Sequence, residues 1–344
     1  MVTTSQQTAD ADQAVSGEAE TGRRLRVVDD TDTPPARKVA WTADQLMSEV
    51  FVPPVWAVPG IIAEGVSLLC GPPKVGKSWA SLGLALSVAA GTDAFGSIPV
   101  DAGDVLYLAL EDTPRRLQSR MRKILAGRSA PSRLTLTIDC PPMDQGGAES
   151  IDNWLTNHPN ARMVIIDVFA KVRGGASPGV AAYDADYAAV GAIKRIADRH
   201  AVPIVLVHHV RKMASDDFLA EVSGTNGIAG AADATLVLKR GRGSADGILY
   251  VTGRDVDEAE YALNFAAETG SWHLLDGDAA DHQLTATRAA IIAYLRQHPP
   301  TGPRAIATAT KLNESTVKST CQRMRDDGVL AVDGGGRYRI PATA

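Results

Sequence analysis

Between about residue 61 and residue 275, short apolar runs alternate along the chain with longer segments of helical periodicity. The runs are rich in Val, Ile and Leu, as expected for strands that are covered on both faces. Helical spacing is clearest in 78–90, 115–125 and 183–200. This alternation predicts an α/β fold, in which helices flank a mostly parallel β-sheet. The expected strands are 66–70, 105–110, 134–138, 163–166, 204–207, 235–238 and 248–252.

The segment before this pattern has a different composition. Residues 1–38 are rich in Thr, Asp, Glu, Gln and Ala and almost free of large apolar side chains. Such a segment buries too little surface to offset the entropy of ordering, so we expect a disordered N-terminal tail. Apolar clusters then alternate with prolines from Trp41 to Gly60, which predicts an extended lead-in that packs on the core.

The pattern changes again after Gly270. A polar linker, 276–283, is expected to separate the core, 39–275, from a small C-terminal domain, 284–344. This domain is expected to contain helices at 286–297, 303–310 and 314–327, then two short strands around Gly334–Gly336. Three helices and a glycine-tipped hairpin predict a winged helix-turn-helix.

The third of these helices carries the clearest local signals. Val317, Cys321 and Met324 recur at i, i+4 and i+7 and form one apolar stripe. Asn313 is the expected N-cap, and Glu314 suits the positive end of the helix.

Composition and charge restrict the function classes. Apolar residues make up 45% of the 344 residues and charged residues 22%, as in globular proteins. The net charge of −5 argues against a chain that coats nucleic acid through bulk charge. No apolar run approaches the roughly 18 residues of a membrane span, and the start lacks a secretory signal pattern. The three separated cysteines fit neither a disulfide framework nor a zinc site, so we expect a cytoplasmic protein without a membrane partner.

One motif carries specific chemistry. The stretch Gly71-Pro-Pro-Lys-Val-Gly-Lys-Ser78 matches G-x-x-x-x-G-K-[ST] at every fixed position, between an apolar strand and a helix. Backbone N–H groups at the start of the helix bind phosphate, Lys77 neutralises its charge and the Ser78 hydroxyl binds Mg²⁺. We therefore expect ATP and Mg²⁺ as ligands. The residues expected to bind the nucleotide are Gly71, Lys74, Val75, Gly76, Lys77, Ser78 and Trp79.

Polar residues end several of the predicted strands. Asp167 closes the run 163–166 and is the expected metal-site carboxylate, but no second acid follows it. Glu111 closes another strand and is the candidate general base, whereas Asp112 is the expected cap of the next helix. His208 and His209 close a third strand, where His209 could contact the γ-phosphate or the base. A solvated acid for Glu111 and a structural histidine remain the alternatives.

The order of these motifs resembles the RecA-like P-loop ATPases, and most closely the hexameric replicative helicases typified by plasmid RepA helicases. The resemblance covers about 45–275. The stretches that carry it are Trp56–Gly60, Lys74–Ser78, Leu108–Asp112, His208–Lys212, Val222–Thr225 and Gly253–Asp255.

The resemblance implies a ring of about six subunits with ATP bound between neighbours. One subunit then supplies a cation to the next, and Arg254 is the candidate for this arginine finger, with Arg240 and Lys239 as alternatives. Loops after Asp167 (Lys171 and Arg173) and after His209 (211–225) would face the channel and grip single-stranded DNA. These loops carry few aromatic residues, which leaves translocation open.

The C-terminal segment has the charge that the rest of the chain lacks. Residues 282–344 hold nine Lys or Arg and four Asp or Glu. The expected DNA-facing residues are Ser315, Thr316, Lys318, Ser319 and Arg323 on the third helix, with Arg337 and Arg339 on the wing. A protein–protein adaptor is the alternative use of the same fold.

Three functions are compatible with these patterns. The first is a DNA-dependent ring ATPase, a replicative helicase of a plasmid, phage or mobile element. The second is an ATP-switched DNA-binding regulator or loader that does not unwind DNA. A small-molecule kinase is the third, and the sequence offers no acceptor-site motif for it.

Overall fold

The computed structural model describes residues 40–174, 182–209, 226–241, 246–277 and 279–341. The chain divides into two compact units, Met1–Val52 and Pro53–Ala344. The tail expected to be disordered, 1–38, lies outside the described residues, as do Arg211 and the rest of the second channel loop.

The first unit contains the short helix α1 (Ala43–Ser48). Thr42 precedes it, and the Thr42 backbone N–H donates to the Gln45 Oε1 atom at 3.3 Å. The expected extended lead-in is helical in this part, because the local capping contact favours a helical turn. Its later part is extended and buried as expected, in the strand β1 (Trp56–Val58) of the second unit. The side chains of residues 40–52 are exposed, including Met47 at 85% and Val50 at 92%.

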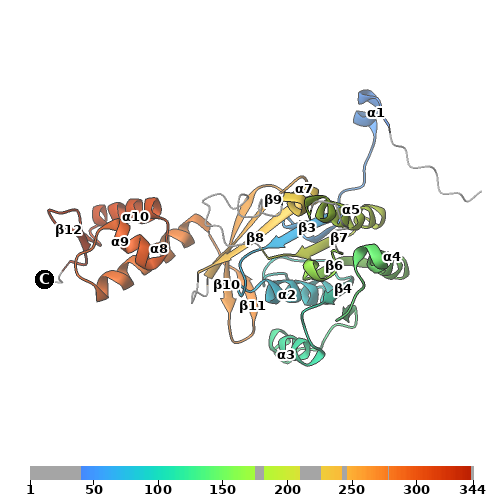
Figure 1. Ribbon diagram of the computed structural model, residues 1–344, viewed down its shortest axis with the longest axis horizontal. Coiled ribbons are helices and arrows are strands. Elements are labelled where there is room, and N and C mark those ends of the chain that lie inside the picture. The colour runs from blue at the N-terminus through green and yellow to red at the C-terminus, as the bar shows by residue number, and fades with distance from the viewer. Residues whose placement is uncertain (1–39, 175–181, 210–225, 242–245, 278, 342–344) are drawn as a thin grey trace, which may run out of the picture. The chain divides into compact units, whose positions relative to one another are not determined.

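The second unit is built on one large sheet (Figure 1). Within the described residues its nine strands run in the order β11-β10-β9-β8-β3-β7-β6-β4-β5. Strands β3 to β8 pair in parallel, and β9, β10 and β11 extend the sheet antiparallel. The strands are β3 (Gly65–Cys70), β4 (Asp104–Ala109), β5 (Leu134–Thr137), β6 (Ala161–Asp167), β7 (Pro203–Val207), β8 (Ala234–Arg240), β9 (Asp246–Gly253), β10 (Ala259–Ala266) and β11 (Ser271–Leu274).

All seven predicted strands are present, as β3 to β9. Strands β10 and β11 were not predicted, because both lie at one side of the sheet, where polar residues such as Glu260, Asn264 and His273 interrupt the apolar run. A separate two-stranded ribbon, β1 (Trp56–Val58) and β2 (Ile62–Ala63), precedes β3.

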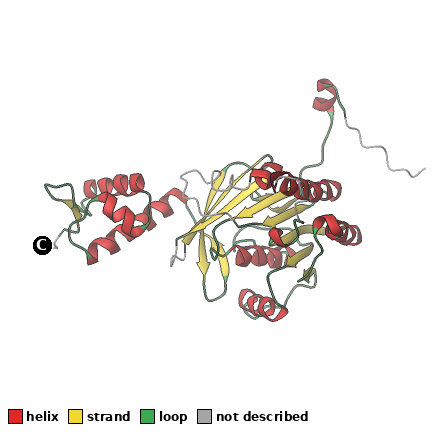
Figure 2. Cartoon of the chain, in the orientation of Figure 1, coloured by secondary structure: helices red, strands yellow, loops and turns green. Residues whose placement is uncertain are grey.

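Helices cover both faces of the sheet (Figure 2). One face packs against α2 (Lys77–Ala90) and α3 (Pro114–Leu125), and the other against α4 (Gly147–Asn157), α5 (Ala182–His200) and α7 (Asn226–Ala231). Alternate residues of each central strand enter the two apolar cores, as the two-residue repeat of a strand requires. The expected α/β architecture is confirmed.

The C-terminal elements have their own apolar core. They are α8 (Ala279–Gln297), α9 (Pro303–Thr310), α10 (Glu314–Asp326), β12 (Ala331–Val332) and β13 (Tyr338–Arg339). Val317, Cys321 and Met324 are fully buried, which confirms the predicted stripe. Asn313 caps α10 by accepting from the backbone N–H groups of Ser315 and Thr316, as expected.

The first of these helices differs from the expectation. It begins at Ala279 rather than at 286, so part of the expected linker 276–283 is helical. The apolar spacing that the prediction used starts only where the helix meets its own core, at residues such as Ile291 and Leu295.

Candidate nucleotide site

The candidate phosphate loop connects β3 to α2, as the sequence predicts. Gly71 has φ +153° and Gly76 has φ +110°, values that favour glycine. A Cβ atom on Gly71 would lie 2.5 Å from the Leu238 carbonyl oxygen, and one on Gly76 would lie 3.0 Å from the Trp272 ring. Both glycines are therefore required by close approaches. Lys74 and Val75 complete the loop, and α2 begins at Lys77.

Lys77 is the first residue of α2, and its ammonium group contacts three acceptors outside that helix. Its Nζ atom donates to the carbonyl oxygens of Gly71 at 2.6 Å and Pro72 at 3.0 Å, and lies 3.1 Å from Nδ1 of His209. Because an ammonium group only donates, Nδ1 of His209 is the acceptor. Burial lowers the pKa of Lys77 to about 8, and negative charge on Asp167 and Glu111 opposes that shift.

Asp167 ends β6 beside this lysine. Its side chain is buried, with 5% of its surface exposed, and burial raises its pKa. The Tyr107 hydroxyl donates to its Oδ2 atom at 2.7 Å, and this bond and one with Ser78 act to lower the pKa. A buried carboxylate next to the Ser78 hydroxyl fits a magnesium ion, which takes one or two carboxylates together with substrate phosphates.

Glu111 and His209 lie at the same edge of the sheet. Glu111 follows β4 and is exposed, and its charge acts on both Lys77 and His209. Burial lowers the pKa of His209, with the charge on Lys77 as the second cause. The structure thus brings Lys77, Asp167, Glu111 and His209 together.

His208 and Asp112 lie next to these residues in the sequence. His208 is buried, and its Nδ1 atom has no hydrogen-bond partner among the described residues. Burial lowers its pKa to about 4, so the ring is neutral. Asp112 is not the cap of α3: the Thr113 side chain accepts from the Arg116 N–H instead, because Asp112 pairs with the guanidinium groups of Arg116 and Arg120.

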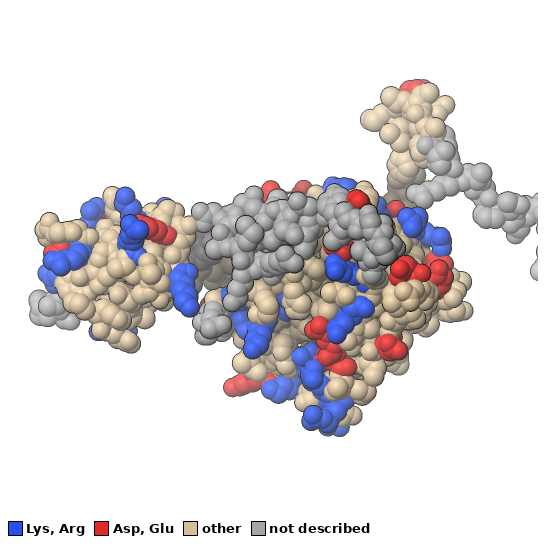
Figure 3. All heavy atoms as spheres, viewed as in Figure 1, with Lys and Arg blue, Asp and Glu red and all other residues tan. Residues whose placement is uncertain are grey.

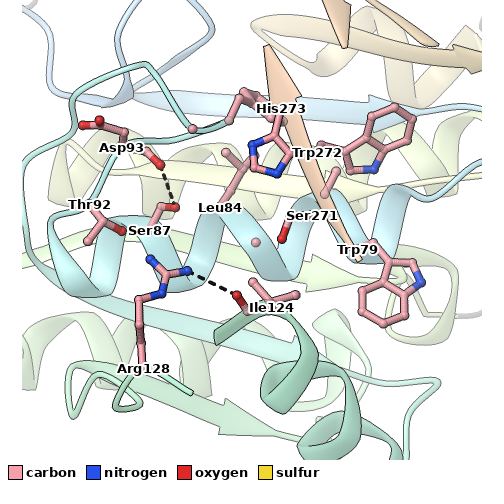
Figure 4. A pocket seen from close by; sticks show the side chains of 14 residues that line it. Trp79, Leu84, Ser87, Thr92, Asp93, Ile124, Arg128, Ser271, Trp272 and His273 are labelled. Atoms are coloured by element: carbon pink, nitrogen blue, oxygen red, sulfur yellow. Dashed lines mark hydrogen bonds between the residues drawn. The ribbon is translucent and has the colours of Figure 1, made fainter. Parts of the chain in front are cut away.

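Aromatic side chains border the loop on the α2 side. The Trp272 Nε1–H donates to the Gly76 carbonyl oxygen at 3.2 Å. Arg120 lies 5.4 Å from the centre of the Trp79 ring. Trp79, Trp272, Ser87, Arg128 and other residues line a pocket along α2, which Figure 4 shows. This pocket includes Trp79 but none of the residues from Gly71 to Ser78.

The candidate arginine fingers, Arg254 and Arg240, lie at opposite ends of the strand β8. Arg254 follows β9, where its N–H donates to the Asp233 carbonyl oxygen and its guanidinium pairs with the Asp233 carboxylate at 3.1 Å. That position is at the start of β8, whereas the phosphate loop lies beside Leu238, about four residues or roughly 13 Å further along the strand. Arg254 is therefore too far from its own phosphate loop to contact it. Arg240, at the far end of β8, stacks on Phe265 and Trp272, and Lys239 lies over Tyr250.

Other expected contact residues are at the surface. Arg173 is exposed and pairs with Asp186 at 2.7 Å, and Lys171 is also exposed. Figure 3 shows basic side chains scattered over the C-terminal elements. The exposed residues there include Ser315, Thr316, Lys318, Ser319, Arg323, Arg337 and Arg339.

Two residues of the site were missed at the sequence level. Tyr107 is a hydroxyl-bearing residue in the middle of an apolar strand, and that exception was the available signal. Trp272 contacts the loop from almost two hundred residues away, and no local pattern connects the two positions.

Similarity to known proteins identifies the family and the fold of the chain. The AAA domain family matches residues 31–215, which is more than half of the chain. A search of curated proteins finds no match. None of the helices in the described part of the chain is long and apolar enough to cross a membrane.

Two solved structures show the same fold. One is described as an ATPase domain, and it aligns with a TM-score of 0.51 and 13% identity, over 62% of this chain and 85% of that one. A DnaB-like replicative helicase, described with its primase interactions, aligns with a TM-score of 0.50 and 13% identity, over 62% of this chain and 57% of that one. The core therefore has a RecA-like fold. On the extent of the family match, the chain belongs to the AAA domain family and is a P-loop ATPase.

Proposed function

We propose that the chain is a ring-forming, DNA-dependent ATPase that acts as a replicative helicase of a plasmid, phage or mobile element. The observation that carries this proposal is the arrangement of Lys77, Asp167, Glu111 and His209 at the edge of the sheet where the phosphate loop lies. Similarity to the fold of a DnaB-like replicative helicase supports the choice of this class.

Each residue of the site has its own role in ATP hydrolysis. Lys77 exchanges its carbonyl and histidine acceptors for phosphate oxygens, and the N–H groups in the first turn of α2 add further donors. Glu111 orients a water molecule for attack on the γ-phosphorus and takes its proton as ADP leaves. Ser78 and Asp167 would hold a magnesium ion, which would neutralise charge on the phosphates.

His209 is placed to respond to the phosphates. Its Nδ1 atom accepts from Lys77, so the proton of the neutral ring is on Nε2. A phosphate that draws Lys77 away frees the ring to turn, and its Nε2–H can then donate to the γ-phosphate or to Glu111. The loop that follows His209 is the second proposed DNA-contacting loop. This arrangement would couple the state of the nucleotide to the grip on single-stranded DNA.

The proposed ring supplies the remaining cation. Arg254 is distant from its own phosphate loop and exposed, with 62% of its side chain accessible, so it is available to a neighbouring subunit. Arg240 is the alternative, although its guanidinium stacks on rings of its own chain. A finger supplied in trans makes hydrolysis depend on assembly into a ring of about six subunits.

The decisive experiment measures the ATPase rate with and without single-stranded DNA, together with strand displacement on a forked duplex. Stimulation accompanied by displacement is the expected outcome. Stimulation without displacement, at any ratio of protein to DNA, would reject the helicase function.

One observation favours a second candidate, an ATP-switched DNA-binding regulator or loader. The C-terminal elements, 279–341, form a three-helix unit with a hairpin and its own core, and they carry the excess of basic residues. We propose that this unit is a winged helix-turn-helix that binds duplex DNA through α10 and the hairpin. Binding of a duplex without unwinding, lost on removal of the unit, would favour the regulator.

A further inference from the structure

A hydroxyl group lies in the apolar core beneath the candidate metal site. Tyr107 is in the middle of β4 and only 1% of its surface is exposed. Its Oη atom lies 2.7 Å from Oδ2 of Asp167 and 3.0 Å from Oγ of Ser81. Tyr107 pairs in register with Ile165 of β6, two residues before Asp167, so the phenol reaches along the sheet to the end of the next strand.

The direction of each hydrogen bond follows from the number of protons. A carboxylate only accepts, so the contact with Asp167 uses the single O–H proton of Tyr107. Ser81 must then donate its own proton to the Tyr107 oxygen. The result is a chain of donors that runs from Ser81 through Tyr107 to Oδ2 of Asp167. Both bonds lie in the protein interior, where water does not compete with them.

The two serines connect this chain to the phosphate loop. Ser78 and Ser81 are one helical turn apart on α2, so their side chains lie on the same face of that helix. Ser81 reaches Asp167 through the Tyr107 hydroxyl, and Ser78 acts on Asp167 to lower the pKa of its carboxyl. The bond from Tyr107 holds one oxygen of the carboxylate and restricts its rotation about the last side-chain bond.

We propose that Tyr107 is a positioning residue that holds Oδ2 of Asp167, which leaves the other carboxylate oxygen for the magnesium ion that Ser78 and Asp167 would hold. This inference rests on the proposed role of Asp167 in metal binding. Groups that orient a metal ligand from behind change metal affinity by about 10- to 100-fold when removed. Nucleotide contacts made by the phosphate loop itself do not involve the phenol.

The test is the affinity of the full-length protein for Mn²⁺ in the presence of saturating ADP, followed by the loss of the free Mn²⁺ signal in electron paramagnetic resonance. Tyr107→Phe is expected to weaken Mn²⁺ binding by about tenfold or more. Its affinity for ADP in EDTA should stay within about twofold of wild type, since that binding needs no metal. Ser81→Ala keeps the phenol and is expected to give a smaller loss, about two- to threefold.

The matched control is Tyr261→Phe on β10, which removes a hydroxyl that donates to the Gly60 carbonyl oxygen. It should bind Mn²⁺ like wild type. A folded Tyr107→Phe variant with wild-type affinity for Mn²⁺ would overturn the proposal. If Tyr107→Phe does not fold, Ser81→Ala decides, and wild-type affinity in that variant overturns the proposal.

The same titration separates this proposal from the proposed function. Asp167→Asn should lose Mn²⁺ binding with ADP. If Asp167→Asn binds Mn²⁺ normally, or if the wild type takes up none, the metal site itself is wrongly assigned and Tyr107 is not the cause. If the wild type binds Mn²⁺ and the Tyr107→Phe variant binds it with the same affinity, only the positioning role of Tyr107 is rejected. The assignment of the ATPase site then stands.

Discussion

Raising the pH above about 8 is expected to weaken nucleotide binding, because Lys77 must carry its proton to bind phosphate. In the nucleotide-free protein burial lowers the pKa of this ammonium from 10.5 to about 8. Bound phosphates stabilise the charged form and raise that pKa again. Above pH 8, nucleotide binding is therefore accompanied by the uptake of one proton. The affinity for nucleotide falls as the proton concentration falls.

The magnitude follows from the position of the pKa. Below pH 8 most of the lysine is charged, and the affinity for nucleotide should be constant. At pH 9 about one-tenth of the nucleotide-free molecules have a protonated Lys77. This weakens nucleotide binding about tenfold, or by about 1.4 kcal/mol. The ligand-free fold responds in the opposite direction. Because the unfolded chain holds this proton up to 10.5, the free energy of unfolding should rise between pH 8 and 10.5.

The assay is equilibrium binding of a fluorescent ADP analogue in EDTA, from about pH 7 to about pH 9.5. The phosphates of the ligand are already ionised over most of this range, with a last pKa of about 6. Lys77→Arg is the matched variant, since a guanidinium keeps its charge throughout. Any binding that remains in Lys77→Arg should not depend on pH above 8. An equally flat profile for the wild type would refute the pKa and the burial argument behind it.

Three further changes test other parts of the structure. Glu111→Gln should bind ATP with wild-type affinity and reduce the hydrolysis rate by at least about a hundredfold, as measured by phosphate release. Arg254→Ala should hydrolyse ATP slowly although it binds ATP normally, and mixing it with a Lys77→Ala variant should restore turnover at sites built from one intact half of each chain. Asn313→Ala should lower the stability of the C-terminal unit by about 1 kcal/mol, measured by chemical denaturation, because it removes the cap of α10.

Each of these has an outcome that contradicts it. Wild-type turnover in Glu111→Gln would show that another group accepts the proton. Normal hydrolysis by Arg254→Ala alone would move the finger to Arg240, which Arg240→Ala then tests in the same mixing experiment. An unchanged denaturation midpoint for Asn313→Ala would mean that the cap contributes little to that unit.

The central part of the fold could be predicted because its strands are uniformly apolar. Val66, Leu106, Val164 and Ile204 lie on strands buried from both sides, and the runs around them are unmistakable in the sequence. Strands β10 and β11 could not be predicted in this way, since they lie at one side of the sheet and their polar residues interrupt the apolar run. Helix α1 escaped the prediction because a six-residue helix has too few positions to show a period.

The site followed a similar division. Lys77 and Ser78 belong to a contiguous motif, and Asp167 ends an apolar strand, so each could be identified locally. The contacts that Tyr107 and Trp272 make with this site depend on which strand lies beside which, and that order is a property of the folded sheet. The cap of α3 was assigned to Asp112 because a sequence does not show that two arginines one turn apart compete for that carboxylate.

The bond between Trp272 and the Gly76 carbonyl oxygen has a practical consequence. An indole whose N–H is bonded to the phosphate loop, and whose ring lies against Gly76, has an emission spectrum that depends on the geometry of that loop. Trp79, the residue after Ser78, also borders the loop, so two of the chain's five tryptophans lie next to it. We therefore expect the intrinsic fluorescence of the protein to change when a nucleotide alters the geometry of this loop, without an attached dye.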